Sequence, residues 1–376
     1  MTAAESGRAL TAVCLDDVRA AAEAVLEPAV RDFAEGGSGT EAVLAANRAA
    51  FADVALVPRV LTGVTAADTG AKLLGSDAAM PVAVAPMAYQ RLFHEDGELA
   101  AARAARTAGV PYVVSTLSSH RVEDIAATGA TTWFQLYCLR DRGKNHELVA
   151  RAEAAGCEAL MVTVDVPVMG RRLRDVRNGF ALPEHVRAAN LDTGPGTEAH
   201  RGFGGASALA VHTSAAFAPG LSWRDLAELR ARTSLPLVVK GVLDPRDARA
   251  AVDAGADGIV VSNHGGRQLD GAVPSLRALP AVAEAVSGDC EVLLDSGVRD
   301  GTDVLKALAL GARGVLLGRP VLWGLAAGGE HGVERVLDLL RTELGANMTL
   351  AGCADTTAAA GLRTERTRTH AFPPRS

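Results

Sequence analysis

Residues 235–270 read LPLVVKGVLDPRDARAAVDAGADGIVVSNHGGRQLD, and no part of the chain is more informative about its architecture. Two short apolar runs, Pro236–Gly241 and Gly258–Asn263, are separated by an alanine-rich helical pattern over Pro245–Ala254. Both runs are continuously apolar rather than alternating, which is typical of parallel strands that are buried on both faces. The stretch therefore predicts one strand–helix–strand unit of a parallel sheet.

The same alternation recurs along the chain after Asp68. The runs predicted as strands are Pro81–Ala88, Pro111–Thr116, Trp133–Tyr137, Ala159–Val166, Pro236–Gly241, Gly258–Asn263, Val292–Gly297 and Gly314–Gly318. Helical patterns between them cover Glu98–Ala108, Arg121–Thr128, Asn145–Ala155, Ser222–Arg232, Pro245–Ala254, Ser275–Val286 and Gly301–Leu310. Eight such units predict an α/β fold, a (β/α)8 TIM barrel. A doubly wound sheet is the alternative, because the number of repeats alone does not exclude it.

The repeats divide the chain into three parts. Residues 1–68 are predicted to be an N-terminal helical extension that packs on the barrel, with one helix over Leu15–Ala34 and a second over Thr40–Val54. Residues 69–355 form the predicted barrel, and residues 356–376 form a C-terminal tail.

Two segments are expected to be poorly ordered. About 70 residues separate the fourth and fifth predicted strands, which is far more than a usual connection. The part from about residue 183 to 220 is weakly periodic and is predicted to be an active-site lid. The polar, proline-containing chain after Thr364 is expected to be frayed.

The composition restricts the function classes. The chain has 376 residues, and its 38 Lys and Arg against 44 Asp and Glu give a net charge of −6, so a nucleic-acid partner is not expected. The five cysteines are scattered singly, which argues against a zinc site or a disulfide framework. The start of the chain lacks the features of a signal peptide, and no apolar stretch reaches membrane-span length. We expect a cytoplasmic protein with a small-molecule ligand, no metal and no membrane partner.

Polar residues stand at the carboxyl ends of the predicted strands. A barrel builds its active site at that face, from the ends of several strands and the loops that follow them. Lys240 is the most telling of them, because it directly follows Leu-Val-Val on an otherwise apolar strand. In chain order the candidates are Ser118, Gln135, Tyr137, Thr163, Asp165, Lys240, Ser262, His264, Asp295 and Arg319.

The segment Ser262–Asp270, SNHGGRQLD, is the strongest chemical signal. His264 can accept a proton near neutral pH, and Arg267 can hold a carboxylate with two parallel hydrogen bonds. The two glycines between them allow the backbone to approach a ligand closely. In the arginine-rich segment after the fourth strand, Arg172 is the best candidate for a second contact to an anionic substrate.

The loops after strands seven and eight carry a third group of candidates. Asp295–Arg299 reads DSGVR, and Gly318 and Arg319 follow the eighth strand. These two loops of a barrel frequently bind phosphate. Their backbone N–H groups and two arginines predict a site for one phosphate of a cofactor.

These motifs together resemble the FMN-dependent α-hydroxy-acid oxidase/dehydrogenase family, over about residues 15–355. The resemblance implies a (β/α)8 barrel that binds FMN at its C-terminal face. It rests on Gln135–Tyr137, Thr163–Asp165, Gly170–Arg172, Val239–Gly241, Ser262–Asp270, Asp295–Arg299 and Gly318–Pro320.

The resemblance implies a role for each substrate-site residue. His264 is implied to be the base that takes a proton from the substrate, and Asp165 to stabilise its imidazolium form. Arg172 and Arg267 are implied to bind the substrate carboxylate, and Tyr137 to donate a hydrogen bond to the substrate.

The resemblance also implies the cofactor contacts. Lys240 is implied to lie near the flavin N1/O2 edge and to favour the anionic reduced flavin. Gln135, Thr163 and Ser262 are implied to contact the ring, and Ala88 to lie near N5. Asp295 is implied to bind the ribityl chain. Ser118 is also predicted to bind the cofactor, and the phosphate is implied to be held by Gly297, Arg299, Gly318 and Arg319.

Two positions depart from the family pattern. Phe33 stands where the family often has tyrosine, which makes the pocket less polar and favours an aromatic or apolar substrate side chain. Ser296 stands where the family usually has glycine, and we expect the loop to tolerate it.

The implied reaction is oxidation of an aromatic (S)-2-hydroxy acid, mandelate or 4-hydroxymandelate, to the 2-oxo acid, with O2 reduced to hydrogen peroxide. Such a product points to hydroxyphenylglycine and antibiotic biosynthesis, and the family implies a homo-oligomer, a tetramer. Three alternatives stay open. They are an oxidase of lactate or glycolate, a mandelate dehydrogenase that uses another acceptor, and a flavin-free, phosphate-binding isomerase or lyase.

Overall fold

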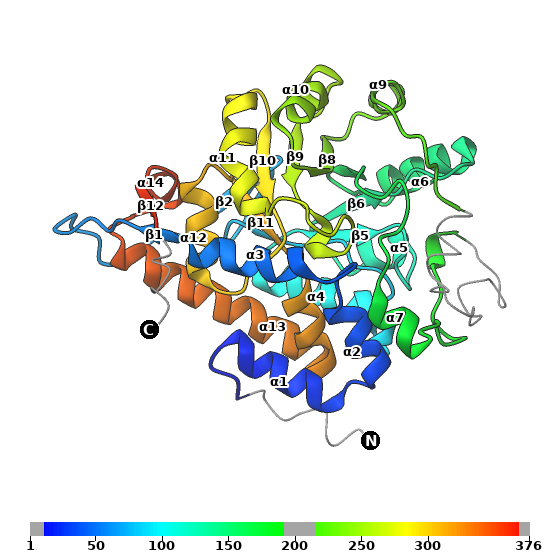
Figure 1. Ribbon diagram of the computed structural model, residues 1–376, viewed down its shortest axis with the longest axis horizontal. Coiled ribbons are helices and arrows are strands. Elements are labelled where there is room, and N and C mark those ends of the chain that lie inside the picture. Colours follow the sequence, from blue (N-terminus) through cyan, green and yellow to red (C-terminus); the bar gives the residue numbers. More distant parts are fainter. Residues whose placement is uncertain (1–10, 192–215, 368–376) are drawn as a thin grey trace, which may run out of the picture.

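The structure is a computed structural model that describes residues 11–191 and 216–367. Its centre is a closed barrel of parallel strands in the order β10-β11-β4-β5-β6-β7-β8-β9 (Figure 1). Closure depends on the pairing of β11 with β4, in which Val315 lies opposite Val82. The barrel is confirmed and the doubly wound alternative is wrong. Its strands are β4 Val82–Val84, β5 Tyr112–Ser115, β6 Thr132–Leu136, β7 Leu160–Thr163, β8 Leu237–Val242, β9 Gly258–Val261, β10 Glu291–Leu294 and β11 Gly314–Leu317.

Helices surround the barrel (Figure 1). A large apolar cluster fills the space between strands and helices, because each helix buries one apolar face against the sheet. All seven predicted helices between the strands are present, each within a few residues of its expected bounds. They are α4 Gly97–Ala108, α5 Val122–Ala126, α6 Arg142–Ala154, α9 Trp223–Arg230, α10 Pro245–Asp253, α11 Ser275–Val286 and α12 Gly301–Ala309.

A separate apolar cluster fills the barrel interior and includes the fully buried Trp133. A hairpin of β2, Ala71–Leu73, and β3, Ser76–Ala78, contributes Leu73 and Leu74 to this cluster. The hairpin precedes β4 in the chain and packs against Gly258 and Gly314 at the starts of their strands. It therefore closes the N-terminal end of the barrel and leaves the C-terminal end for the loops.

The N-terminal extension differs from the prediction of one helix over Leu15–Ala34. The structure has α1, Leu15–Val25, and α2, Pro28–Glu35, because Leu26 leaves the helical conformation and Pro28 starts a new helix. The next predicted helix is present as α3, Ala42–Ala52.

A long helix was not predicted at all. Helix α13, Arg319–Leu350, begins directly after β11 and bends at Gly328 and Gly329. It packs against α1 and α4, and so joins the N-terminal extension to the barrel (Figure 1). Its first residue, Arg319, was predicted only as a loop residue after the eighth strand.

The C-terminal region also corrects an expectation. The chain was expected to fray after Thr364, but β12, Thr364–Arg366, pairs antiparallel with β1, Val54–Leu56. The rest of the segment expected to fray, residues 368–376, lies outside the described residues. The short helix α14, Thr356–Ala360, precedes it. Two segments that are far apart in sequence therefore form a two-stranded sheet beside the barrel, and the region 1–68 is not wholly helical.

The long connection between β7 and β8 is described only at its two ends. It contains α7, Leu173–Asn178, and the short 3-10 helix η2, Ala189–Leu191, and resumes at residue 216. Phe217 forms an isolated antiparallel bridge with Leu139, after β6. Most of the predicted lid, including its predicted poor order, lies outside the described residues.

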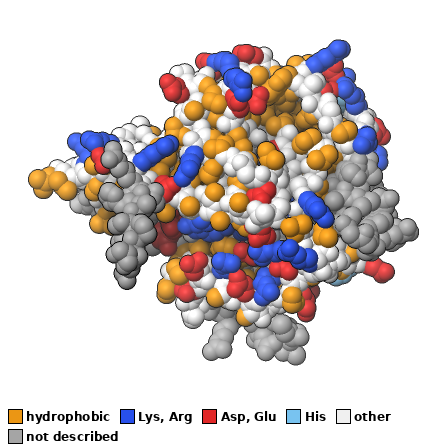
Figure 2. All heavy atoms as spheres, in the orientation of Figure 1, with side chains coloured by type: hydrophobic (Ala, Val, Ile, Leu, Met, Phe, Trp, Pro, Cys, Tyr) orange, Lys and Arg blue, Asp and Glu red, His pale blue; other side chains and the backbone are white. Residues whose placement is uncertain are grey.

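Charged side chains of both signs are interspersed on the face shown in Figure 2. Within the described part of the chain, no helix is both long and apolar enough to cross a membrane.

Candidate active site

A cavity with about 1260 Å³ of open space lies at the carboxyl ends of the strands. Every barrel strand, or the loop that follows it, contributes to its wall, as expected for an active site of this fold. Helix α2 adds Phe33 and Ala34 from the N-terminal extension. The predicted site residues that line the cavity are Phe33, Ala88, Tyr137, Thr163, Arg172, Lys240, His264, Arg267, Asp295, Gly297, Arg299, Gly318 and Arg319.

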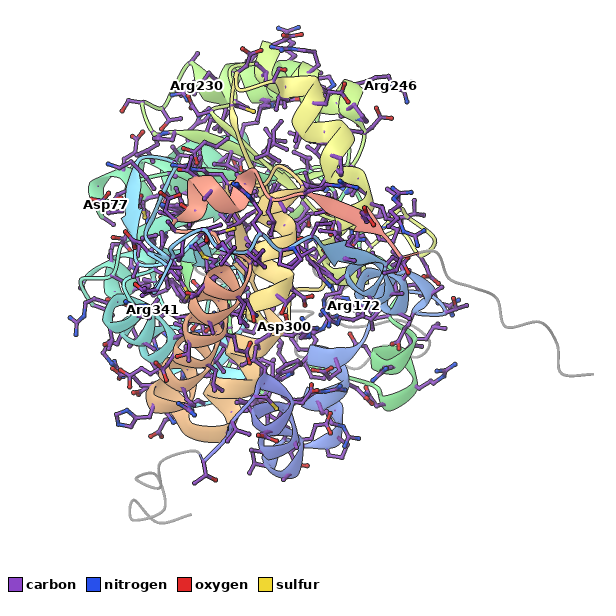
Figure 3. The ribbon with its side chains drawn as sticks, turned by 90° about the vertical axis from the view of Figure 1, so that its left-hand side faces the viewer. Asp77, Arg172, Arg230, Arg246, Asp300 and Arg341 are labelled. Atoms are coloured by element: carbon purple, nitrogen blue, oxygen red, sulfur yellow. The ribbon has the colours of Figure 1, made fainter. Side chains whose placement is uncertain are left out.

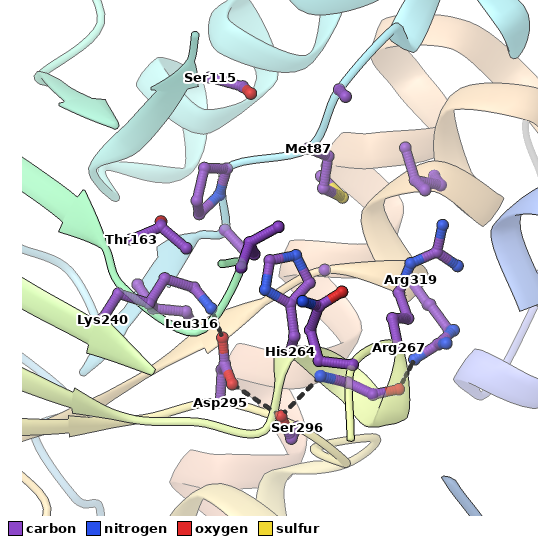
Figure 4. Close-up of a pocket in the computed structure, with 18 of the residues that line it drawn as sticks. Met87, Ser115, Thr163, Lys240, His264, Arg267, Asp295, Ser296, Leu316 and Arg319 are labelled. Carbon is purple, nitrogen blue, oxygen red and sulfur yellow. Dashed lines mark hydrogen bonds and ion pairs between the residues drawn. The ribbon is translucent and has the colours of Figure 1, made fainter. Parts of the chain in front are cut away.

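His264 stands at the centre of this cavity (Figure 4). It starts the short 3-10 helix η4, His264–Gly266, with a left-handed φ of 59°. Its Nδ1 lies 2.9 Å from Oδ1 of Asp165, and its Nε2 lies 3.4 Å from the hydroxyl of Tyr137. One ring nitrogen is thus oriented by a carboxylate, while the other faces the cavity.

The Asp165 carboxylate is suited to stabilise a protonated His264. Burial raises the pKa of Asp165, but the neighbouring His264 and Lys240 outweigh that effect, so its pKa is lowered. Gly241 packs against it, and a Cβ at that position would lie 2.6 Å from the Asp165 Cβ. Burial, together with Asp165, raises the pKa of Tyr137, which keeps its hydroxyl protonated as a hydrogen-bond donor.

Two arginines form a site for a carboxylate. The Arg267 guanidinium donates to the carbonyls of Phe33 and Gly36, at 2.7 and 2.9 Å, at the C-terminal end of α2. Those carbonyls carry the negative end of the helix dipole and hold the guanidinium in place. Arg172 is the residue before α7, and both guanidiniums lie over the Phe33 ring, 5.9 Å away for Arg172 and 5.2 Å for Arg267.

The electrostatics of this pair favour an anion. Burial lowers the pKa of Arg172, and burial together with Arg172 lowers the pKa of Arg267, because each charge repels the other. The buried Nε of Arg172 has no hydrogen-bond partner among the described residues. Figure 3 shows Arg172 near the middle of the view, whereas Arg230 and Arg246 lie near its upper edge. A bound carboxylate would satisfy the orphaned donor and relieve the repulsion.

Lys240 forms a buried ionic network on the opposite side of the cavity (Figure 4). Its ammonium lies 2.7 Å from Oδ2 of Asp295 and donates to Oγ of Ser262 at 2.9 Å. Burial lowers the pKa of Lys240, but Asp295 and Asp165 outweigh it, so its pKa is raised. Lys240 therefore supplies a permanent positive charge at the cavity wall.

Arg299 and Arg319 are placed to bind a phosphate. Arg319 is the first residue of α13, and it donates to the carbonyls of Ala34 and Gly265 at 2.9 and 3.0 Å. Burial lowers the pKa of both guanidiniums. Arg319 lowers the pKa of Arg299 further, and Arg267 does the same to Arg319. The N-terminus of a long helix adds its partial positive charge. Acidic neighbours offset these two buried positive charges only in part, because the pKa values of both guanidiniums stay lowered. Such a cluster fits a phosphate-bearing cofactor such as FMN.

Ser296 replaces the usual glycine and has a left-handed φ of 75°. Its hydroxyl donates to Asp295 at 2.7 Å and accepts from the Gly265 N–H at 2.8 Å. These contacts link the Asp295 loop to the His264 loop. The strain of a non-glycine residue in this conformation is thus accompanied by two hydrogen bonds that glycine could not make.

Three predicted residues lie behind the lining. Asp165 supports His264, Ser262 supports Lys240 and the His264 N–H, and Gln135 donates to the Thr163 hydroxyl at 3.0 Å.

The geometry does not support the predicted role of Ser118. This side chain is fully buried outside the cavity and donates to the His120 carbonyl at 2.7 Å. Ser115, three residues earlier and on β5, lines the cavity instead. Ser115 is the last residue of β5, whereas Ser118 lies beyond the end of the strand, where strand alternation no longer determines the direction of a side chain.

Sequence reasoning also missed several residues that line the cavity or stand directly behind its lining. Phe217 stacks on Tyr137 with ring centroids 4.6 Å apart, and Phe180 stacks behind Phe33 at 4.8 Å. Gln268, which belongs to the SNHGGRQLD motif but had no role, lines the cavity as well. Among the described residues, no cluster of His, Cys, Asp and Glu could hold a metal ion.

Comparison with known proteins agrees with this geometry. A family model described as FMN-dependent dehydrogenase matches residues 22–363. The chain is 58% identical to the 4-hydroxymandelate oxidase of Amycolatopsis orientalis, over 95% of this chain and 99% of that protein. It is 49% identical to an L-lactate oxidase of a Nostoc species, over 86% and 90% of the two chains. Human 2-hydroxyacid oxidase 1 is 45% identical, over 91% and 93%.

Solved structures give the same result. A crystal structure of mandelate oxidase with (S)-4-hydroxymandelic acid matches with a TM-score of 0.92 and 58% identity, covering 94% of this chain and 99% of that one. A second structure of mandelate oxidase matches with a TM-score of 0.89 and 56% identity, covering 95% and 99%.

Proposed function

Because the chain belongs to the FMN-dependent dehydrogenase family, we propose that its substrate is an aromatic (S)-2-hydroxy acid, 4-hydroxymandelate or mandelate. The products are the 2-oxo acid and hydrogen peroxide. The observation that carries the proposal is the aromatic wall beside the carboxylate site, in which Arg172 and Arg267 both lie over Phe33 and Phe180 stacks behind it. A substrate whose carboxylate binds these arginines places its side chain among aromatic rings.

The residues of the chain divide the work of the reaction. Arg172 and Arg267 bind the carboxylate, and the Tyr137 hydroxyl donates a hydrogen bond to the substrate. His264 takes a proton from the substrate at Nε2, and Asp165 stabilises the resulting imidazolium through Nδ1. Bound FMN supplies the acceptor for the two electrons that leave the hydroxy acid, and O2 takes them up with two protons to form hydrogen peroxide.

The same residues provide for the cofactor. We propose that Lys240 holds a positive charge beside the flavin ring, that Asp295 binds the ribityl chain, and that Arg299 and Arg319 bind the phosphate. Ser115 replaces Ser118 in this proposal, because it lines the cavity. Family membership sets aside the flavin-free isomerase or lyase.

The test is the visible absorption spectrum of the purified holoenzyme before and after anaerobic addition of (S)-4-hydroxymandelate. We expect the flavin bands to bleach and to recover when air is admitted, with hydrogen peroxide formed. Bands that stay unchanged with this substrate but bleach with L-lactate would overturn the aromatic substrate in favour of the lactate-type alternative. Bleaching without recovery in air would favour the dehydrogenase.

The tetramer, the cytoplasmic location and the role in hydroxyphenylglycine biosynthesis are further parts of the proposal. The tetramer and the biosynthetic role rest on the resemblance, and the location rests on the five singly scattered cysteines, which fit a reducing compartment. Light scattering and cell fractionation measure the first two.

A further inference from the structure

The side chain of Gln268 ties together the two loops that carry the substrate-site residues. Its Oε1 accepts a hydrogen bond from the Gly170 N–H at 3.0 Å. Its Nε2 donates to the carbonyls of Asp165 and Val168, at 2.8 and 3.0 Å. Both hydrogens of the amide and one acceptor position are thus matched to backbone groups of residues 165–170.

Each of these two loops supplies one member of the Asp165–His264 pair and one member of the arginine pair, Arg172 and Arg267. The loop after β7 carries Asp165 and leads to Arg172, whereas the loop after β9 carries His264 and Arg267. The distance from Asp165 to His264 and the spacing of the two arginines therefore depend on how these loops are placed relative to each other.

The backbones of the two loops also touch at Gly170. A Cβ at this position would lie 2.4 Å from the Arg267 carbonyl oxygen and 2.8 Å from the Gln268 Cα. The close approach brings the Gly170 N–H within reach of the Gln268 amide. Packing thus places the loops in contact, and directed hydrogen bonds determine their register.

We propose that Gln268 is a positioning residue that sets the spacing of the arginine pair and of the Asp165–His264 pair. The inference rests on the proposed function of these pairs. Gln268 acts through backbone groups of the neighbouring loop and needs no contact with the reacting atoms. Glutamine is the residue type required here, because only a side-chain amide offers two donors and an acceptor at this reach. A displacement of about 1 Å at a site of this kind can cost about a hundredfold in rate.

Two variants of the full-length holoenzyme test the inference. Gln268→Met keeps the length of the side chain and removes all three hydrogen bonds. Gln268→Glu keeps the acceptor for the Gly170 N–H but turns a carboxylate oxygen toward the carbonyls of Asp165 and Val168. We expect kcat/KM to fall by at least about tenfold in both. Phenylglyoxylate is the 2-oxo acid formed from mandelate, and its binding perturbs the flavin spectrum. We expect its Kd, measured from that perturbation, to rise by at least about tenfold.

The pH dependence distinguishes positioning from general destabilisation. As the pH falls toward about 4 to 5, the carboxyl group of Gln268→Glu gains a proton and regains one donor. Relative to wild type at each pH, kcat/KM of this variant is therefore expected to rise, whereas that of Gln268→Met stays low. A loss that arises only from lower stability would not recover in this way.

A control variant with comparable loss of hydrogen bonds lies at the other end of the barrel. Ser76 donates to Glu158 and accepts from Trp133 there, at 2.5 and 3.1 Å. Ser76→Ala is expected to lower Tm and to leave kcat/KM and the Kd of phenylglyoxylate unchanged.

Two results would overturn the inference. The first is that kcat/KM of Gln268→Met, and its Kd for the 2-oxo acid, stay within about twofold of the wild-type values. The other is a Gln268→Glu profile that runs parallel to wild type at all pH values. Both comparisons use whichever 2-hydroxy acid the wild type oxidises, with its own 2-oxo acid in place of phenylglyoxylate for the Kd. A wrong aromatic substrate would therefore show in the wild type and not in the difference between wild type and variants.

Discussion

At the residue scale, Arg172 is a charged residue of the cavity wall whose hydrogen-bonding capacity is not fully used. It is buried beside a second guanidinium, its Nε has no hydrogen-bond partner among the described residues, and burial lowers its pKa. Structures retain such an arrangement where a ligand completes it. The geometry of the missing partner follows from the guanidinium, whose parallel N–H groups match the two oxygens of a carboxylate.

We therefore predict that Arg172→Lys raises KM for the 2-hydroxy acid by about ten- to a hundredfold. A single ammonium would replace a bidentate contact between guanidinium and carboxylate, in which each charged hydrogen bond is worth about 1.5–3 kcal/mol. Steady-state kinetics measure KM, and the flavin absorbance serves as the control for FMN content. An unchanged KM would remove Arg172 from the carboxylate site. Arg174 offers a matched control, because it pairs with Glu41 and does not line the cavity.

At the element scale, the short strands β1 and β12 join the segment after α3 to the C-terminal end of the described chain. Their backbone pairing places Val54 opposite Arg366, and the Thr367 N–H donates to the Asp53 carbonyl at 2.9 Å. In Figure 1 this small sheet lies on the side of the molecule opposite α7. It contributes no residue to the wall of the cavity.

We predict that a chain ending at Arg363 has a lower Tm, by about 2–4 °C for each kcal/mol lost, because the hydrogen bonds of β12 to β1 disappear. Its KM and kcat should match those of the full chain. Thermal unfolding and steady-state kinetics on the two proteins decide this. A truncated chain with normal Tm would mean that the pairing adds no stability, and an altered KM would connect the small sheet to the active site.

At the scale of the whole molecule, the cavity concentrates positive charge in a chain with a net charge of −6. Arg319 is the first residue of α13, and it also binds the C-terminal carbonyls of α2. Arg299, in the loop between β10 and α12, lies over the ring of Trp323 in α13, 5.0 Å from its centroid. The N-terminal extension, the barrel and the long C-terminal helix therefore meet at the proposed phosphate site. Binding of an anion there stabilises the folded state as a whole, because the unfolded chain has no such site.

Removal of FMN is accordingly predicted to lower Tm, and added FMN to restore it. At a free FMN concentration of 100 times Kd the gain is about 2.7 kcal/mol. Inorganic phosphate alone should restore part of the loss, since it can occupy the site of Arg299 and Arg319. Sodium chloride at equal ionic strength is the control. Equal effects of phosphate and chloride would contradict a specific phosphate site.

Much of this architecture was predictable because its signals are local. Apolar runs such as Leu237–Val239 and the helical patterns between them depend on residues a few positions apart, so the eight strands and seven intervening helices followed from the chain. Polar residues at strand ends, with His264 and Arg267 in one short motif, likewise indicated where the chemistry lies.

The sequence by itself thus determined the strand–helix repeat, the cofactor class implied by the motifs, and most of the residues at the mouth of the barrel. Only the tertiary structure decided that β11 closes against β4, that Ser115 rather than Ser118 faces the cavity, and that Phe217 stacks on Tyr137. These outcomes depend on contacts between segments that are distant in the chain, or on the direction a side chain takes after its strand has ended. Strand and helix periodicities carry no information about either.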